Sequence, residues 1–89
     1  MKIKHEYILE YIGGKYVVVN TNSKSLNFNK ILALNETSKL LWQALEKDTN
    51  KDELVKILID NYQIGKDKAV DDVNMFIDEL NKLECIEYE

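Results

Sequence analysis

The stretch LALNETSKLLW, residues 32–42, changes from one backbone conformation to another within a few residues. Its first three residues are typical of a buried extended segment and its last five of a helix. The side chain of Asn35 can accept a hydrogen bond from the amide of Thr37 or Ser38, which a helix start otherwise leaves without a partner. Glu36 adds negative charge where the helix dipole favours it. We therefore expect strand before Asn35 and helix after it.

Three extended segments precede this junction. His5 to Ile12 alternates loosely between apolar and polar residues, as a half-buried strand does. The Gly13-Gly14 pair follows, and glycine reaches the positive φ of a two-residue hairpin without steric cost. Lys15 to Asn20, rich in Val and Tyr, reads as a second strand, and a third runs from about Phe28 to Leu34. The order predicts a three-stranded antiparallel sheet.

Three helices are expected after the junction, at residues 36 to about 47, 51 to 62 and 67 to 83. Asn50 is expected to cap the second helix, and with Glu53 three residues later it resembles a capping box. Apolar residues at helical spacing are expected to face the core: Leu41, Ala44 and Leu45 with Leu40 and Trp42 on the flanks, then Leu54, Val55, Leu58 and Tyr62, then Ala69, Val70, Val73, Phe76, Ile77, Leu80 and Leu83. The tail after Leu83 is either a short extended piece or a frayed end.

A run of strands followed by a run of helices indicates an α+β fold. The three helices are short and closely linked, and with a small antiparallel sheet they are winged-helix-like. We therefore expect one domain over residues 1–89, with a three-stranded antiparallel sheet at about 5–34 followed by a three-helix bundle at about 36–83.

Composition and charge exclude several classes of function. Hydrophobic residues make up 45% and charged residues 31% of the chain, which suits a globular domain. Apolar runs such as residues 16–19 are far shorter than the ~20 residues of a membrane helix. The net charge is −4 and every basic residue is a lysine, which argues against nucleic acid as a partner. The broken apolar segment at the N-terminus is unlike a signal peptide, and a single cysteine fits a reducing compartment, so we expect a cytoplasmic protein.

Catalysis has little support in this sequence. His5 is the one histidine, and it reads as a partly exposed strand residue. Cys85 reads as a small packing residue, because its acidic neighbour Glu84 raises a thiol pKa rather than lowering it. The acidic pairs at 71–72 and 78–79 are interpreted as the solvent-exposed face of a helix. We expect no catalytic residue, no metal site and no cofactor.

Recognition of a peptide is the remaining kind of function. A sheet of three strands leaves the outer edge of the third strand unpaired, and such an edge can accept a strand from another chain. On a helical wheel centred on Val73, Met75 falls outside the apolar stripe, beside Asp72 and Glu79. An adaptable apolar side chain in this place would suit the wall of a groove.

Three motifs resemble the PqqD-like family, whose members are also called RiPP precursor peptide recognition elements. The first is Phe-x-x-Ile-x-x-Leu-Asn-Glu-Thr at 28–37, followed by Trp42. The others are Asp-Glu-Leu-Val at 52–55 with Tyr62, and Asp-Val-x-x-Phe-Ile-x-x-Leu at 72–80. The resemblance covers roughly residues 5–87. It departs from the family at 84–86, where Glu-Cys-Ile replaces a common Gly-Leu-Ile at the end of the third helix.

The resemblance implies a non-catalytic adaptor. Family members bind the leader segment of a ribosomally made precursor peptide and present it to a modifying enzyme, often a radical SAM protein. The leader lies as an added strand between the third strand and the third helix. The site residues implied here are Asn29, Lys30, Ile31, Leu32, Ala33, Leu34, Asp72, Met75, Phe76 and Glu79.

Two alternatives stay open at this point. A winged-helix DNA-binding regulator has the same helix order, although the third helix carries more acidic than basic residues. A structural subunit that docks on an enzyme without binding a leader is the other. The sequence does not identify the precursor, the enzyme or the modification. A free edge can also pair with its own copy, so a homodimer is left open.

Overall fold

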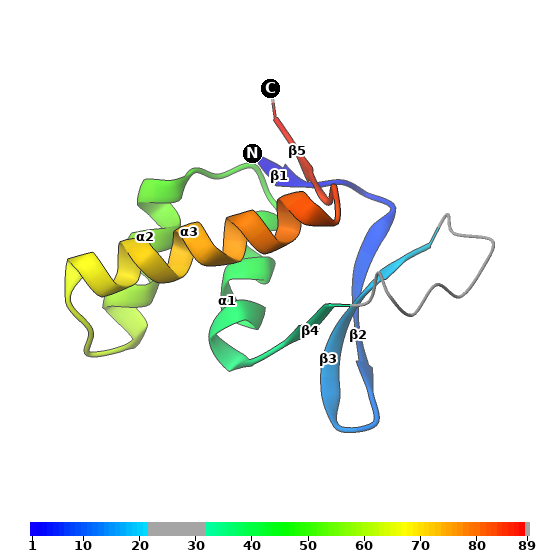
Figure 1. Cartoon of the computed structure of the whole chain (residues 1–89), viewed down its shortest axis with the longest axis horizontal. Helices are drawn as coiled ribbons and strands as arrows, with labels where there is room; N and C mark the ends of the chain where they lie inside the picture. Colours follow the sequence, from blue (N-terminus) through cyan, green and yellow to red (C-terminus); the bar gives the residue numbers. More distant parts are fainter. Residues whose placement is uncertain (22–31, 89) are drawn as a thin grey trace.

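The computed structural model of the protein describes residues 1–21 and 32–88. The described elements are, in chain order, β1 (Lys2–Ile3), β2 (Tyr7–Ile12), β3 (Lys15–Asn20), β4 (Leu32–Leu34), α1 (Glu36–Leu45), α2 (Lys51–Asn61), α3 (Lys66–Lys82) and β5 (Ile86–Glu87). Figure 1 shows the hairpin of β2 and β3 extending from one end of a helical layer. The predicted α+β fold of a three-stranded sheet and three helices is confirmed.

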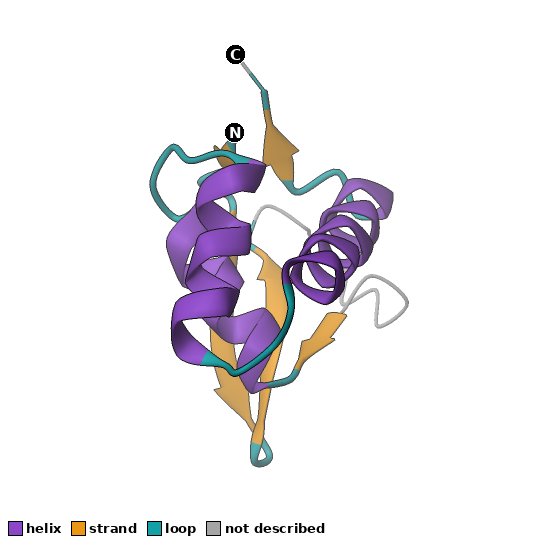
Figure 2. Cartoon of the chain, turned by 90° about the vertical axis from the view of Figure 1, so that its left-hand side faces the viewer, coloured by secondary structure: helices purple, strands orange, loops and turns teal. Residues whose placement is uncertain are grey.

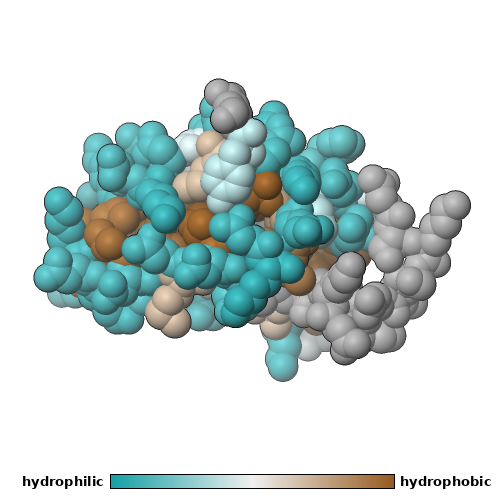
Figure 3. Space-filling model, turned by 45° about the horizontal axis from the view of Figure 1, so that its top comes forward, coloured by the Kyte–Doolittle hydropathy of each residue, from teal (hydrophilic) through white to brown (hydrophobic). Residues whose placement is uncertain are grey.

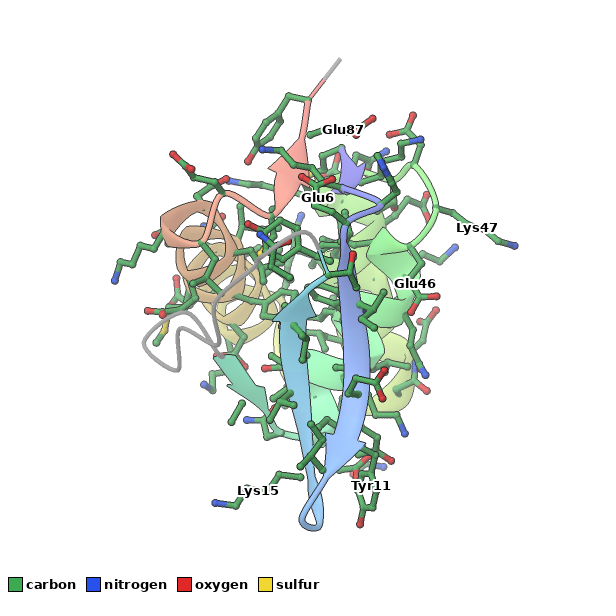
Figure 4. The ribbon with its side chains drawn as sticks, turned by 90° about the vertical axis from the view of Figure 1, so that its right-hand side faces the viewer. Glu6, Tyr11, Lys15, Glu46, Lys47 and Glu87 are labelled. Atoms are coloured by element: carbon green, nitrogen blue, oxygen red, sulfur yellow. The ribbon has the colours of Figure 1, made fainter. Side chains whose placement is uncertain are left out.

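The main sheet has the strand order β2-β3-β4, and both pairings are antiparallel. Ile12 pairs with Lys15 across a turn whose glycines have φ of 59° and 83°, so the Gly13-Gly14 hairpin forms as predicted. Tyr16, Val17 and Val18 of β3 pair with the three residues of β4. Figure 4 shows Tyr11 and Lys15 near the hairpin end of this sheet.

Side-chain caps start the first two helices. The side chain of Asn35 accepts a hydrogen bond from the amide of Ser38 at 2.8 Å, and that of Asn50 accepts one from the amide of Glu53 at 2.9 Å. The strand-to-helix change at Asn35 therefore has the predicted cause. Both asparagines have extended φ and ψ, as N-cap residues do.

Buried apolar residues from every helix form one core beneath the sheet. The fully buried side chains with the largest volumes are Trp42, Leu41, Leu45, Leu54, Leu58, Leu80, Val18, Val73 and Cys85. Trp42, expected on a flank of the apolar stripe, is 1% exposed and belongs to the core, as an aromatic residue beside such a stripe usually does. Ala44, expected on the inner stripe, is only partly buried.

Two short strands near the ends of the described chain pair with each other, which the sequence did not predict. β1 pairs with β5 in a separate antiparallel two-stranded sheet, with Ile3 opposite Ile86. The amide of Lys4 donates to the carbonyl of Cys85 at 2.8 Å. The C-terminal tail, for which an extended piece and a frayed end were both open, is thus extended and paired through residue 87.

Several predicted boundaries shift by one to two residues. The first strand of the main sheet begins at Tyr7, because His5 lies in a turn with its side chain 94% exposed. α1 ends at Leu45 rather than near Lys47. Most of the surface in Figure 3 is hydrophilic, with smaller apolar areas between the polar side chains. Among the described residues, no helix is both long and apolar enough to span a bilayer.

Candidate functional site

An open groove of about 440 Å³ lies between β4 and α3. In Figure 2 these two elements lie on one side of the molecule, while α1 and α2 lie on the other. The groove is lined by Ala33, Leu34, Asn35, Thr37, Ser38, Leu41, Lys68, Asp72, Met75, Phe76 and Glu79. Five residues of α3 form one wall of the groove, at positions 68, 72, 75, 76 and 79. They share one face of the helix because they are spaced three to four positions apart.

The floor of the groove is apolar. Leu34, Leu41 and Phe76 line it and are 7%, 1% and 7% exposed. Met75 stands on the α3 wall with 67% of its surface exposed, which is the highest value among the large hydrophobic residues described. A ligand that covers Met75 and this floor would therefore remove apolar surface from water, which favours binding.

The α3 rim of the groove is charged. The Nζ of Lys68 donates to the Oδ1 of Asp72 at 2.7 Å, and this hydrogen bond raises the pKa of Lys68. Glu79 lies about one turn beyond Phe76, and the Nζ of Lys82 is 3.3 Å from its Oε1. The opposite rim is uncharged where Asn35, Thr37 and Ser38 line it.

The β4 strand is at the edge of the main sheet. Its only strand partner within residues 1–21 and 32–88 is β3. In a strand, successive residues direct their N–H and C=O groups to opposite sides. Some main-chain groups of Leu32–Leu34 therefore face away from β3, toward the side where a further strand would add.

The C-terminal end of α3 is fastened to the sheet. The phenol of Tyr7, on β2, donates to the carbonyl oxygen of Leu83 at 2.8 Å. Burial is the main cause that raises the pKa of this phenol, so Tyr7 remains a donor at neutral pH. Together with the β1–β5 pair, this contact helps to fix where α3 lies beside β4.

Six of the residues implied by the resemblance line the groove: Ala33, Leu34, Asp72, Met75, Phe76 and Glu79. Leu32 belongs to β4 and pairs with Val18. Asn29, Lys30 and Ile31 lie outside the described residues. Sequence reasoning missed Lys68, although its position four residues before Asp72 would have placed it on the same face.

Cys85 is buried among apolar residues. Burial raises the pKa of its thiol to about 11, so it is protonated at neutral pH. The predicted direction of this shift is right, but burial rather than an acidic neighbour is its main cause. In the part of the chain that the structure describes, no cluster of three or more His, Cys, Asp or Glu side chains could hold a metal ion.

The fold and the groove define a small α+β domain of the winged-helix type with a lined cleft beside an edge strand. The chain belongs to the family described as coenzyme PQQ synthesis protein D (PqqD), whose family model matches residues 9–86. The resemblance found in the sequence is thereby confirmed. A search of curated proteins found no match.

The chain is also similar in fold to a solved structure described as "TbiB1 in Complex with the TbiA(beta) Leader Peptide". The TM-score is 0.78 at 19% sequence identity, and the superposition covers 100% of this chain and 98% of the other. The fold is therefore shared over nearly the whole length of both chains.

Proposed function

We propose that this protein is a non-catalytic adaptor that binds the leader segment of a ribosomally synthesised precursor peptide. The leader would add as a strand along β4 and present the rest of the peptide to a modifying enzyme such as a radical SAM protein. The observation that carries this proposal is an edge strand, β4, that borders an apolar groove walled by α3. A structure of the same fold is titled as a complex with a leader peptide, which supports the same ligand class here.

The edge strand β4 and the apolar floor of the groove would both contribute to the affinity for a leader. Main-chain hydrogen bonds to β4 would bind any extended peptide, at about 0.5–1.5 kcal/mol net for each bond. The apolar floor would add selectivity for peptides with a hydrophobic side chain, since full burial of such a side chain contributes about 1.5–3 kcal/mol. We infer a cytoplasmic location, because precursor peptides are made there by ribosomes.

The DNA-binding alternative has no comparable support. The exposed surface of α3 carries Asp67, Asp71 and Asp78, whose charges would repel phosphate. A homodimer that paired two copies of β4 would occupy the same edge and so would compete with the leader.

The proposal can be tested by titrating the ¹⁵N-labelled protein with the leader encoded beside its gene. Amide resonances of β4 and of the groove face of α3 are expected to shift. Shifts confined to α2, or none at micromolar concentrations, would contradict the proposal.

A proline substitution tests the mode of binding. Ala33→Pro should weaken leader binding, because the ring distorts the edge strand. The matched control is Lys51→Pro, since residue 51 is the first of α2, where proline is tolerated. If Ala33→Pro kept both its melting temperature and its affinity, strand addition would be the wrong mode.

A further inference from the structure

We propose that Glu79 makes the groove selective for an extended segment that carries a lysine or arginine two residues from an apolar side chain seated over Phe76. This inference rests on the proposed function, and it specifies the side chains that the groove would accept.

Phe76 and Glu79 are closer together along α3 than alternate residues are along a strand, and the long side chain of a guest lysine or arginine can span the difference. Glu79 lies three residues beyond Phe76, which is about 4.5 Å along a helix that rises 1.5 Å per residue. Side chains on one face of a strand recur every second residue, about 6.6 Å apart. For a guest strand that runs along α3, a side chain over Phe76 therefore places the next side chain on the same face within reach of the Glu79 carboxylate.

Glu79 is more available to a guest cation than Asp72 is. Asp72 has a side chain only 27% exposed and a short contact of 2.7 Å to Lys68. Glu79 and its neighbour Lys82 are 52% and 73% exposed, and their contact is longer, at 3.3 Å. An exposed pair of this kind contributes little to stability, so a guest cation can replace Lys82 without a large cost.

The rest of the groove supports a preference for positive charge. α3 carries five acidic residues against three lysines, so its net charge is negative. The facing rim at Asn35, Thr37 and Ser38 carries no charge on these side chains. The sign of the preferred guest charge is thus determined by α3.

The test is a selection from a library of random heptapeptides displayed on phage. Peptides that bind the native protein should be enriched in Lys or Arg two positions from an apolar residue. With Glu79→Lys as target, this enrichment should disappear and acidic residues should take the same position. The matched control is Asp60→Lys, which makes the same change in net charge at an exposed residue of α2 outside the groove lining and should keep the native pattern.

Affinities of one selected peptide then measure the effect. Changing its basic residue to Glu should weaken binding to the native protein about fivefold, and should strengthen binding to Glu79→Lys by a similar factor. Both effects should shrink in 1 M salt, where charges are screened within about 3 Å.

Failure of this inference and failure of the proposed function give different results. Enriched peptides that lose binding to Ala33→Pro, but show the same residue pattern on the native protein and on Glu79→Lys, would overturn the role of Glu79 alone. A selection that enriched no peptide dependent on β4 would overturn the proposed function and this inference together.

Discussion

Replacing Glu84 by glycine should stabilise the protein. Glu84 follows the C-cap residue Leu83 of α3 and has φ of 56°, in the left-handed region. Its amide donates to the carbonyl of Asn81 at 3.0 Å, and the amide of Cys85 donates to that of Leu80 at 3.1 Å. These two hydrogen bonds define a Schellman motif, in which the left-handed residue is usually glycine.

The expected change in the free energy of unfolding is the difference between two opposing effects. A residue with a Cβ in the left-handed region costs about 1–2 kcal/mol, which glycine avoids. Glycine also makes the unfolded chain more flexible, which costs about 0.4–1 kcal/mol of stability. The side chain of Glu84 is exposed, so little packing is lost. The net gain should be about 0.5–1 kcal/mol, or roughly 2–8 °C in melting temperature for a domain of this size.

Urea and thermal unfolding followed by circular dichroism would measure this gain. The matched control is Glu84→Ala, which removes the carboxylate but retains the Cβ, and it should bring no comparable gain. If both variants gained equally, relief of charge repulsion rather than of backbone strain would be the cause. If Glu84→Gly lost stability, the reasoning from the left-handed conformation would be refuted.

Four further outcomes are expected. Tyr7→Phe should lower the free energy of unfolding in urea by about 1 kcal/mol, because the carbonyl of Leu83 loses its donor. Asn35→Ala should cost about 1 kcal/mol in the same assay through loss of the cap on α1. Met75→Ala should weaken leader binding measured by calorimetry with little change in melting temperature, whereas Ile59→Ala, a control at an exposed apolar residue of α2, should leave binding unchanged. The pKa of Cys85 is raised to about 11 in the folded protein, so the buried thiol contributes fully to stability below the ordinary thiol pKa. This contribution is lost as pH rises toward 11. Urea titrations from pH 8 to 11 should show the decline in the free energy of unfolding, and the decline should be smaller in Cys85→Ala.

The sequence was sufficient to predict elements that local chemistry determines. Gly13-Gly14 specified the hairpin, and Asn35 and Asn50 specified two helix starts, because each acts on residues within one turn of itself. The groove face of α3 followed from residue spacing together with the family resemblance. A wheel of α1 alone places Trp42 on a flank, and it does not show how fully the sheet and the other helices bury this side chain.

The width of the groove depends on features that local patterns do not reveal. β1 and β5 have two residues each, which is too short to show an alternation of apolar and polar residues. Their pairing brings together two segments from opposite ends of the described chain. Their pairing, the contact from Tyr7 to Leu83 and the buried Cys85 all act at the C-terminal end of α3. The rest of this helix packs along α2. We therefore expect the distance between α3 and β4 to depend both on packing against α2 and on these contacts at the C-terminal end of the helix. A change there, at Tyr7 for example, should alter the affinity of the groove for a peptide without replacing any residue that lines it.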